Sequence, residues 1–302
     1  FDQRTLAWLA GVGIVFAFGV WDDRAPLSPA AKLLGQLLAI SCVVFVGGIS
    51  IETFTLGQRH LLPVWVSVPV TFLFLLGATN AVNLADGLDG LAGGMTLLSC
   101  GALGLLGITY GVTPVAVTAF AMAGGILGFL RFNTYPARIF MGDGGSQFLG
   151  FAVATLALML TQDPGVPLST ALPLMLLGCP AVDTVMVRAQ RWLEGSGLVS
   201  SDRRHVHHKL LDLGFDHAEA VVVIYAMQAV FFVAAWQLRY ETDLLIAAVF
   251  LLLALFIVGA LGMAGRLGWR WRHEPSLAEP ATSPLRRALA WLAAPARLPR
   301  WA

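Results

Sequence analysis

Charged residues are scarce in this sequence of 302 residues: only 12% are Asp, Glu, Lys or Arg, whereas soluble domains carry about 25%. Hydrophobic residues make up 57% of the chain, and its mean hydropathy is +0.76. These values exclude a disordered chain, a coiled coil and a nucleic-acid-binding protein with a large basic surface. The composition instead predicts an integral membrane protein.

Cysteine is also rare, and its three copies have no spacing that is typical of a site. Cys42, Cys100 and Cys179 each lie in an apolar run, which excludes a disulfide framework and a cysteine-based metal site. The sequence contains no GxxxxGK[ST] motif, and this absence excludes a Walker-type nucleotide site. Any chemistry must therefore depend on other residues.

Long stretches without any charged residue are, by contrast, abundant. A transmembrane helix needs about 20 apolar residues, and at this composition only helices satisfy their own backbone in lipid. One run is long enough for two helices, because Tyr110 to Pro114 supplies a turn. We therefore predict an all-α polytopic membrane protein with nine transmembrane helices in the runs 5–21, 33–51, 60–85, 90–130, 144–162, 164–182, 220–238 and 244–265.

The 19 basic residues are distributed unevenly between the two sides of the membrane. Nine crossings place only Arg4, Arg59 and Arg239 on one side and the other 16 on the opposite side. The richer side is expected to face the cytoplasm. We assign residues 1–265 to a single transmembrane catalytic domain and residues 266–302, which are rich in Arg, Trp and Pro, to a cytoplasmic tail on anionic headgroups.

Ionisable residues near the membrane are costly, so each cluster of them is a candidate functional site. Four clusters occur, and all of them lie in the connections assigned to the cytoplasm. The first is Asp22 and Asp23, at the end of the first expected helix. Because adjacent carboxylates repel each other, this pair predicts a nearby cation.

The second cluster consists of Asn80, Asn83, Asp86 and Asp89, which recur every three residues. This spacing predicts a polar stripe along one face of a helix. Oxygen ligands beside glycines, which permit close backbone approach, are suited to Mg²⁺ and phosphate groups. A polar packing seam is the alternative interpretation, and four polar residues in phase favour the site.

The third cluster places Asp143 in a glycine-rich turn just before an expected helix. Backbone N–H groups at a helix start favour an anion, and a carboxylate there can hold a metal ion that bridges to a phosphate. Phe140, three residues earlier, is either a core residue or a stacking platform. The residue type alone favours the core.

The fourth cluster contains three histidines that follow two arginines. Zinc sites usually have other histidine spacings or paired cysteines, and no cysteine is near. His and Arg donors are better suited to anions. Carboxylates for Mg²⁺ and cations for phosphates, on one membrane face, together predict phosphoryl transfer at the boundary between water and lipid. The residues of this cluster are Arg203, Arg204, His205, His207 and His208.

The four motifs follow one another between about Trp21 and Gly214. They read Asp-Asp, Asn-x-x-Asp-Gly-x-Asp-Gly-Leu, Asn-x-Tyr-Pro-Ala-x-x-Phe-Met-Gly-Asp-x-Gly-Ser and Asp-Arg-x-His-x-His-His. This order resembles the polyprenyl-phosphate N-acetylhexosamine-1-phosphate transferases. The last motif is similar to the branch that uses UDP-GlcNAc, and it differs from the Pro-Leu-His-His-His of the branch that uses the muramoyl-pentapeptide nucleotide. The family pattern also includes two further N-terminal helices, so we expect about eleven helices in the intact protein.

The resemblance implies transfer of GlcNAc-1-phosphate from UDP-GlcNAc to a polyprenyl phosphate, which gives polyprenyl-diphospho-GlcNAc and UMP. This would be the first membrane step of cell-envelope glycopolymer synthesis at the bacterial inner membrane, with Mg²⁺, or alternatively Mn²⁺, as cofactor. Another UDP-N-acetylhexosamine, including UDP-MurNAc-pentapeptide, is an alternative donor. A proton-coupled transporter is an alternative from another class, which the gathering of charge at one face disfavours. The oligomeric state stays open, and a homodimer is one alternative.

The resemblance also implies roles for individual residues. Asp143 and Asn83 would be Mg²⁺ ligands, and Phe140 would stack on the uridine. Since a phosphate monoester has a second pKa of about 6, the nucleophile is already ionised, and we expect Asp22 and Asp23 to orient it rather than to remove a proton. The implied catalytic residues are Asp22, Asp23, Asp86, Asp89, Asp143, His207 and His208. The implied substrate-binding residues are Lys32, Asn83, Asp89, Asn133, Phe140, Arg203, Arg204 and His205.

Overall fold

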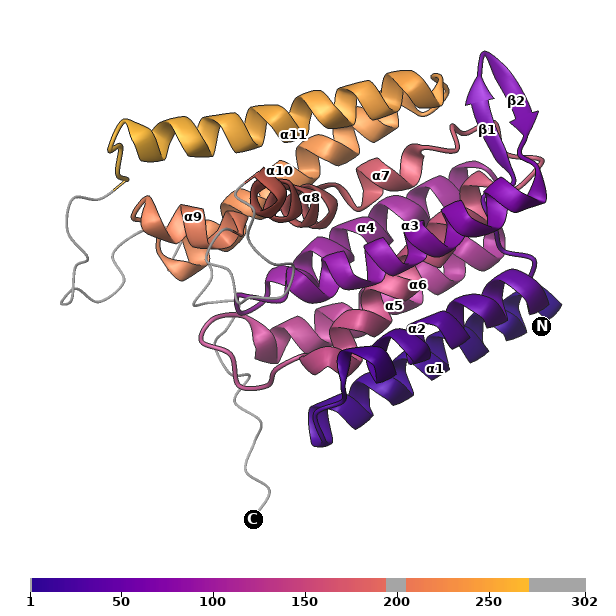
Figure 1. Ribbon diagram of the computed structural model, residues 1–302, viewed down its shortest axis with the longest axis horizontal. Helices are drawn as coiled ribbons and strands as arrows, with labels where there is room; N and C mark the ends of the chain where they lie inside the picture. The colour runs from indigo at the N-terminus through magenta and orange to yellow at the C-terminus, as the bar shows by residue number, and fades with distance from the viewer. Residues whose placement is uncertain (1, 194–204, 272–302) are drawn as a thin grey trace.

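The computed structural model describes residues 2–193 and 205–271 of the chain (Figure 1). Apart from a short β-hairpin, its regular elements are helices, so the prediction of an all-α polytopic protein is confirmed. A π-helical turn, η1 (Cys42–Val46), extends α2. The elements are α1 (Gln3–Arg24), α2 (Pro29–Ser41), β1 (Thr53–Leu56), β2 (Gln58–Leu61), α3 (Val64–Leu84), α4 (Leu91–Thr109), α5 (Thr113–Asn133), α6 (Gly142–Thr161), α7 (Leu172–Leu176), α8 (Gly178–Leu193), α9 (Val206–Asp212), α10 (His217–Leu238) and α11 (Asp243–Arg266).

Eight helices of the described part are long and apolar enough to cross a membrane: α1, α2 with η1, α3, α4, α5, α6, α10 and α11. The ninth expected span, 164–182, differs, because the short α7 and the start of α8 occupy it. Pro173 and Pro180 each lie within the first three residues of their helix, where a missing N–H is tolerated. The two prolines therefore favour two helix starts over one continuous helix.

The helices α1 to α6 lie side by side, and α6 is at the centre of the group (Figure 1). It packs against α1, α3, α4 and α5, and most of its residues are buried. The α1–α2, α3–α4 and α5–α6 connections all lie at the left-hand ends of their helices in Figure 1, and the α3–α4 connection lies close to α9. The connections that carry the candidate residues therefore gather at one end of the bundle.

The β-hairpin lies at the opposite end of the bundle (Figure 1). Its strands pair antiparallel around Gly57, whose φ of 77° suits only a glycine without strain. The Arg59 guanidinium donates hydrogen bonds to the carbonyls of Thr161, Asp163, Val166 and Leu168. These bonds fix the hairpin to the far end of α6, away from the candidate site.

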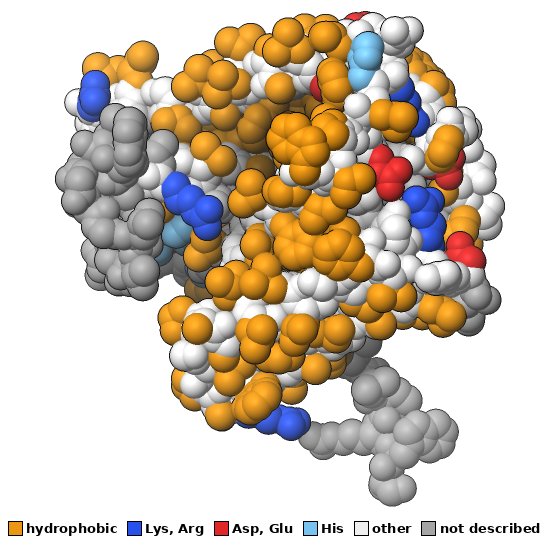
Figure 2. Space-filling model, turned by 45° about the vertical axis from the view of Figure 1, so that its right-hand side comes forward, with side chains coloured by type: hydrophobic (Ala, Val, Ile, Leu, Met, Phe, Trp, Pro, Cys, Tyr) orange, Lys and Arg blue, Asp and Glu red, His pale blue; other side chains and the backbone are white. Residues whose placement is uncertain are grey.

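The outer surface is that of a protein in lipid. Figure 2 shows hydrophobic side chains over most of the visible face, with only scattered charges. Large apolar side chains are exposed along the outer helices, for example Leu252 and Phe256 of α11. Because hydrocarbon, not water, would contact these side chains, the exposure agrees with a multi-pass membrane protein.

Candidate active site

A lysine joins two carboxylates at the end of the helix bundle. Lys32 Nζ, from the first turn of α2, lies 2.5 Å from Asp22 Oδ2 at the end of α1. It also lies 3.0 Å from Asp143 Oδ2 at the start of α6. The cation that the adjacent carboxylates require is therefore Lys32, although 111 residues separate it from Asp143 along the chain.

Asp23 caps the start of α6. Its Oδ1 accepts a hydrogen bond of 2.7 Å from the backbone N–H of Asp143, and its Oδ2 accepts one of 3.0 Å from that of Gly144. The sequence predicted an anion at this helix start, and the structure shows that the anion is the Asp23 carboxylate. Asp22 and Asp23 therefore have different surroundings, since the Oδ1 of Asp22 accepts from the N–H of Leu27.

Asn83 connects α3 to α6. Its Nδ2 donates to Asp143 Oδ1 at 3.0 Å and to Ser146 Oγ at 2.8 Å. The structure thus brings together Asp143 and Asn83, the pair expected from the family resemblance to bind the metal ion. Lys32 and Asn83 contact different oxygens of the Asp143 carboxylate, and together they fix its orientation.

The polar stripe expected to continue along one helix does not extend beyond Asn83. The α3 helix ends at Leu84, and Asp86 and Asp89 lie in the loop that leads to α4. Gly90, the residue just before α4, has a φ of 81°, a conformation that favours glycine. The expectation of one helical face was wrong here, because a periodic pattern does not show where a helix ends.

Asp86 is a half-buried carboxyl group with no hydrogen bond to another residue of the described part. Burial, followed by the negative charges of Asp143 and Asp89, raises the pKa of Asp86 to about 6. The negative charges around the loop between α3 and α4 are therefore not fully neutralised, although Lys32 pairs with two carboxylates of the same site. A cation at this place would relieve the repulsion.

These donors fit a magnesium ion by their chemistry. Asp143, Asp86 and Asn83 offer carboxylate and amide oxygens, which Mg²⁺ prefers. In residues 2–193 and 205–271, no three His, Cys, Asp or Glu side chains form a cluster that could hold a metal ion. Mg²⁺ does not require such a cluster, since it is bound through one or two carboxylates together with water and substrate phosphates.

Two loops are held together beside this charged layer. The buried Asn133 side chain accepts a hydrogen bond from the N–H of Gly90 and donates one to the carbonyl of Ile139. Asp89 Oδ2 accepts from the N–H of Ala137. Asn133 and Asp89 therefore join the α3–α4 loop to the α5–α6 loop, and their implied role in substrate binding stays a prediction.

Phe140 projects from the second of these loops. Its side chain is 78% exposed, so the interpretation as a core residue, which its type favoured, was wrong. The ring is accessible at the same end of the bundle as Asp143. Of the two alternatives, the stacking platform is the one that agrees with this exposure.

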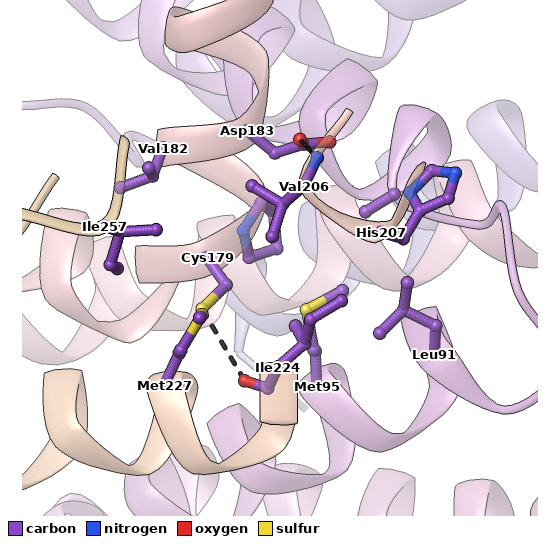
Figure 3. A pocket seen from close by; sticks show the side chains of 12 residues that line it. Leu91, Met95, Cys179, Val182, Asp183, Val206, His207, Ile224, Met227 and Ile257 are labelled. Carbon is purple, nitrogen blue, oxygen red and sulfur yellow. Dashed lines mark hydrogen bonds between the residues drawn. The ribbon is translucent and has the colours of Figure 1, made fainter. Parts of the chain in front are cut away.

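The histidine cluster is anchored by a buried carboxylate. Asp183 Oδ2 lies 2.7 Å from His205 Nδ1. Asp183 Oδ1 accepts a 2.6 Å hydrogen bond from the N–H of Val206 (Figure 3). His207 is 4% exposed and lies beside a cavity of about 20 Å³. A Cβ added to Gly87 would lie 2.5 Å from His207 Nε2. The cluster therefore packs directly against the α3–α4 loop.

Burial, followed by the proximity of His208, lowers the pKa of His207 to about 4. The unfolded chain takes up this proton near pH 6.5, but the folded chain does not until about pH 4. His207 therefore contributes stability above pH 6.5, on the order of 3 kcal/mol, that is lost as the pH falls from 6.5 to 4. We expect the Tm in detergent to fall more in this window for the wild type than for His207→Gln, and equal slopes would contradict the lowered pKa.

Several residues of the site could not be singled out from the sequence. The N–H of Asp89 donates to His217 Nε2 at 3.0 Å, and the Tyr135 ring stacks on His217. Tyr225 donates to the carbonyl of Gly90. His217 and Tyr225 belong to none of the four motifs, whereas Tyr135 is part of the third. Asp183 could have been suspected, as a carboxylate within an apolar run. Arg203 and Arg204, for which the family resemblance implies substrate binding, lie outside the described residues.

The fold and the site define a multi-pass membrane protein with a charged, carboxylate- and histidine-lined site at one membrane face. A model of glycosyl transferase family 4 matches residues 5–161, about half of the chain. The chain therefore belongs to this family, as the motifs indicated.

Three relatives with similar sequences are sugar-phosphate transferases by name. A probable undecaprenyl-phosphate N-acetylglucosaminyl 1-phosphate transferase of Bacillus subtilis (strain 168) is 33% identical over 80% of this chain and 68% of its own length. The undecaprenyl-phosphate alpha-N-acetylglucosaminyl 1-phosphate transferase of Yersinia pestis is 30% identical over 81% and 70%. The decaprenyl-phosphate N-acetylglucosaminephosphotransferase of Mycolicibacterium smegmatis is 35% identical over 70% and 58%. The chain thus aligns with 58–70% of the length of these relatives.

Proposed function

We propose that this protein transfers GlcNAc-1-phosphate from UDP-GlcNAc to a polyprenyl phosphate and releases UMP. A terminal oxygen of the lipid phosphate attacks the phosphorus that bears the sugar, and the bond between the two donor phosphates breaks. The observation that carries the proposal is the joining of Asp22, Lys32, Asn83 and Asp143, from four helices, at one membrane face. The names of the relatives support the same reaction.

The location of the site suits two substrates that arrive from different phases. A nucleotide sugar approaches from water, and a polyprenyl phosphate presents its headgroup at the membrane surface. The charged groups lie at the ends of α1 and α3 and at the starts of α2 and α6, which is where lipid meets water. The excess of basic residues on this side supports a cytoplasmic orientation, and we propose the bacterial inner membrane as the location.

We propose that Asp143 and Asn83 hold a Mg²⁺ ion, with Mn²⁺ as an alternative, and that Asp86 lies beside it. When bound, the ion would neutralise charge on the donor diphosphate and on the departing UMP. Lys32 is already oriented by Asp22 and Asp143, so its ammonium group is held in place for a phosphate oxygen. Because this positive charge is already in place, no side chain has to reorganise to stabilise the charge that develops during the reaction.

The remaining groups orient the substrates. Asp23 holds the first turn of α6 and thereby the backbone of Asp143. Phe140 offers an exposed ring for the uracil base. Neutral His207, with His205 and His208, would donate hydrogen bonds to the diphosphate and the sugar. Since the lipid phosphate is already ionised at neutral pH, Asp22 has no proton to remove, and we propose that it orients the nucleophile through Lys32.

The decisive measurement is UMP release by the full chain in detergent, with Mg²⁺ and undecaprenyl phosphate. We expect release from UDP-GlcNAc, with a matching lipid-linked product by mass spectrometry. Undecaprenol, which lacks the phosphate, is the matched control and should give no product. A panel of UDP-N-acetylhexosamines, including UDP-MurNAc-pentapeptide, identifies the sugar. Absence of UMP from every donor would refute the transferase function.

A further inference from the structure

A layer of buried amide side chains lies beneath the charged site. Gln36 of α2 donates to Gln147 Oε1 of α6 at 2.9 Å, and Asn80 of α3 donates to Gln36 Oε1, also at 2.9 Å. Asn80 donates further to the carbonyl of Leu76 at 2.8 Å. Gln36 and Gln147 are 5% and 4% exposed. Three amides from three helices therefore form one connected network inside a membrane-spanning bundle.

Each amide lies one helical turn from a residue of the charged site. Gln36 follows Lys32 by four residues on α2, and Gln147 follows Asp143 by four residues on α6. On α3, Asn80 precedes Asn83 by three residues. Residues three or four positions apart share a helix face. The amide network and the charged site are therefore two successive layers, built by the same three helices.

The amide network lies inside the helix bundle, where polar side chains are unfavourable. Amides are costly inside lipid, and apolar side chains would fill the same space. Between transmembrane helices there is little hydrophobic driving force, and apolar contacts between them lack direction. Hydrogen bonds between amides do have direction, and they fix both the rotation and the axial position of each helix. The network thus determines where the next turn of each helix places its side chain.

We propose that Gln36, Asn80 and Gln147 are positioning residues that set the geometry of Lys32, Asn83 and Asp143. They touch neither substrate, and they act through the relative register of α2, α3 and α6. In the proposed function, which this inference uses, they determine how well the site binds the divalent ion and how fast it turns over. A loss of the network would displace the charged groups without removing any of them.

The test compares Gln147→Leu with a matched control on the same helix. Thr155→Val also removes a buried hydrogen bond between helices, because Thr155 Oγ1 accepts from Trp8 Nε1 at 2.8 Å. Thr155 lies 12 residues from Asp143, about 18 Å along α6, so its loss should not reach the site. Both variants are purified in detergent, and their Tm values are compared to show that both are folded.

Three readouts distinguish positioning from a role in stability alone. We expect Gln147→Leu to lower kcat about tenfold or more and to raise the Mg²⁺ concentration for half-maximal activity several-fold. Binding of Mn²⁺ without substrates, followed by electron paramagnetic resonance, should weaken by a similar factor. Thr155→Val should stay within twofold of the wild type in all three measurements, even where its Tm falls.

Each result has one interpretation. If Gln147→Leu matches Thr155→Val, with a lower Tm and unchanged kcat and Mn²⁺ binding, the network is structural only and the proposal is wrong, while the transferase function stands. If the wild type releases no UMP but Gln147→Leu selectively weakens Mn²⁺ binding, the positioning stands and the transferase function fails. A wild type that neither releases UMP nor binds Mn²⁺ would overturn both.

Discussion

Replacing Asp143 by asparagine is expected to lower kcat/KM for transfer by about 10³-fold, because it removes a fixed charge at the reacting phosphates. The carboxylate has two roles in the structure: its Oδ2 lies 3.0 Å from Lys32 Nζ, and its Oδ1 accepts from Asn83 at 3.0 Å. An amide retains the shape but lacks the charge that orients the lysine and would bind Mg²⁺. UMP release at saturating Mg²⁺ measures the effect.

The matched control is Asp163→Asn, just beyond the opposite end of α6. Asp163 accepts a hydrogen bond of 2.8 Å from the N–H of Gly165, so this variant also loses a carboxylate that caps a turn. Since it lies across the membrane from Asp143, we expect its activity to stay within twofold of the wild type. An Asp143→Asn enzyme with more than a tenth of wild-type kcat/KM would show that this carboxylate is not central to transfer.

Gly19→Ala is expected to lower transfer about 10- to 100-fold and to reduce stability by about 1–3 kcal/mol. A Cβ at residue 19 would lie 2.5 Å from Gly144 Cα and 2.8 Å from the carbonyl oxygen of Asp143. These are backbone atoms, so α1 and α6 would have to separate. One turn further along α1, Asp23 holds the start of α6, and a separation would break its hydrogen bonds of 2.7 and 3.0 Å.

Gly13→Ala provides the control within the same helix, because no atom lies within 4 Å of a Cβ built at Gly13. We expect this variant to keep the activity and the Tm of the wild type. The two variants differ only in whether the new methyl group meets α6. Equal activity of Gly19→Ala and Gly13→Ala would mean that the close approach of the two backbones does not hold the active site.

The identity of the site could largely be predicted from the sequence because charge is so rare in the chain. Asp22, Asp143 and Lys32 are conspicuous between apolar runs, since an ionisable group at a membrane helix is costly and is retained for a function. Asn83 and Asp86 were found from the polar residues that recur every three positions beside them. Their side chains do meet or approach one another in the structure, from helices that are far apart in sequence.

The partners of these groups could not be predicted, because they depend on distances between helices. The sequence does not indicate that Asp23, rather than a substrate, is the anion at the start of α6. The exposure of Phe140 and the contact of Gly87 with His207 are likewise products of packing. Gln36 and Gln147 could not be singled out from the sequence, because each is a single polar residue in an apolar run.

By itself, the sequence determined the membrane class, most of the spans and the types of group at the candidate site. These follow from composition and spacing, because the cost of burying charge acts on each residue separately. Only the tertiary structure decided which carboxylate pairs with Lys32, where α3 ends before Asp86, and how the amide layer joins α2, α3 and α6. Those choices depend on the register between helices, and register is set by directional hydrogen bonds and close glycine contacts between segments distant in sequence.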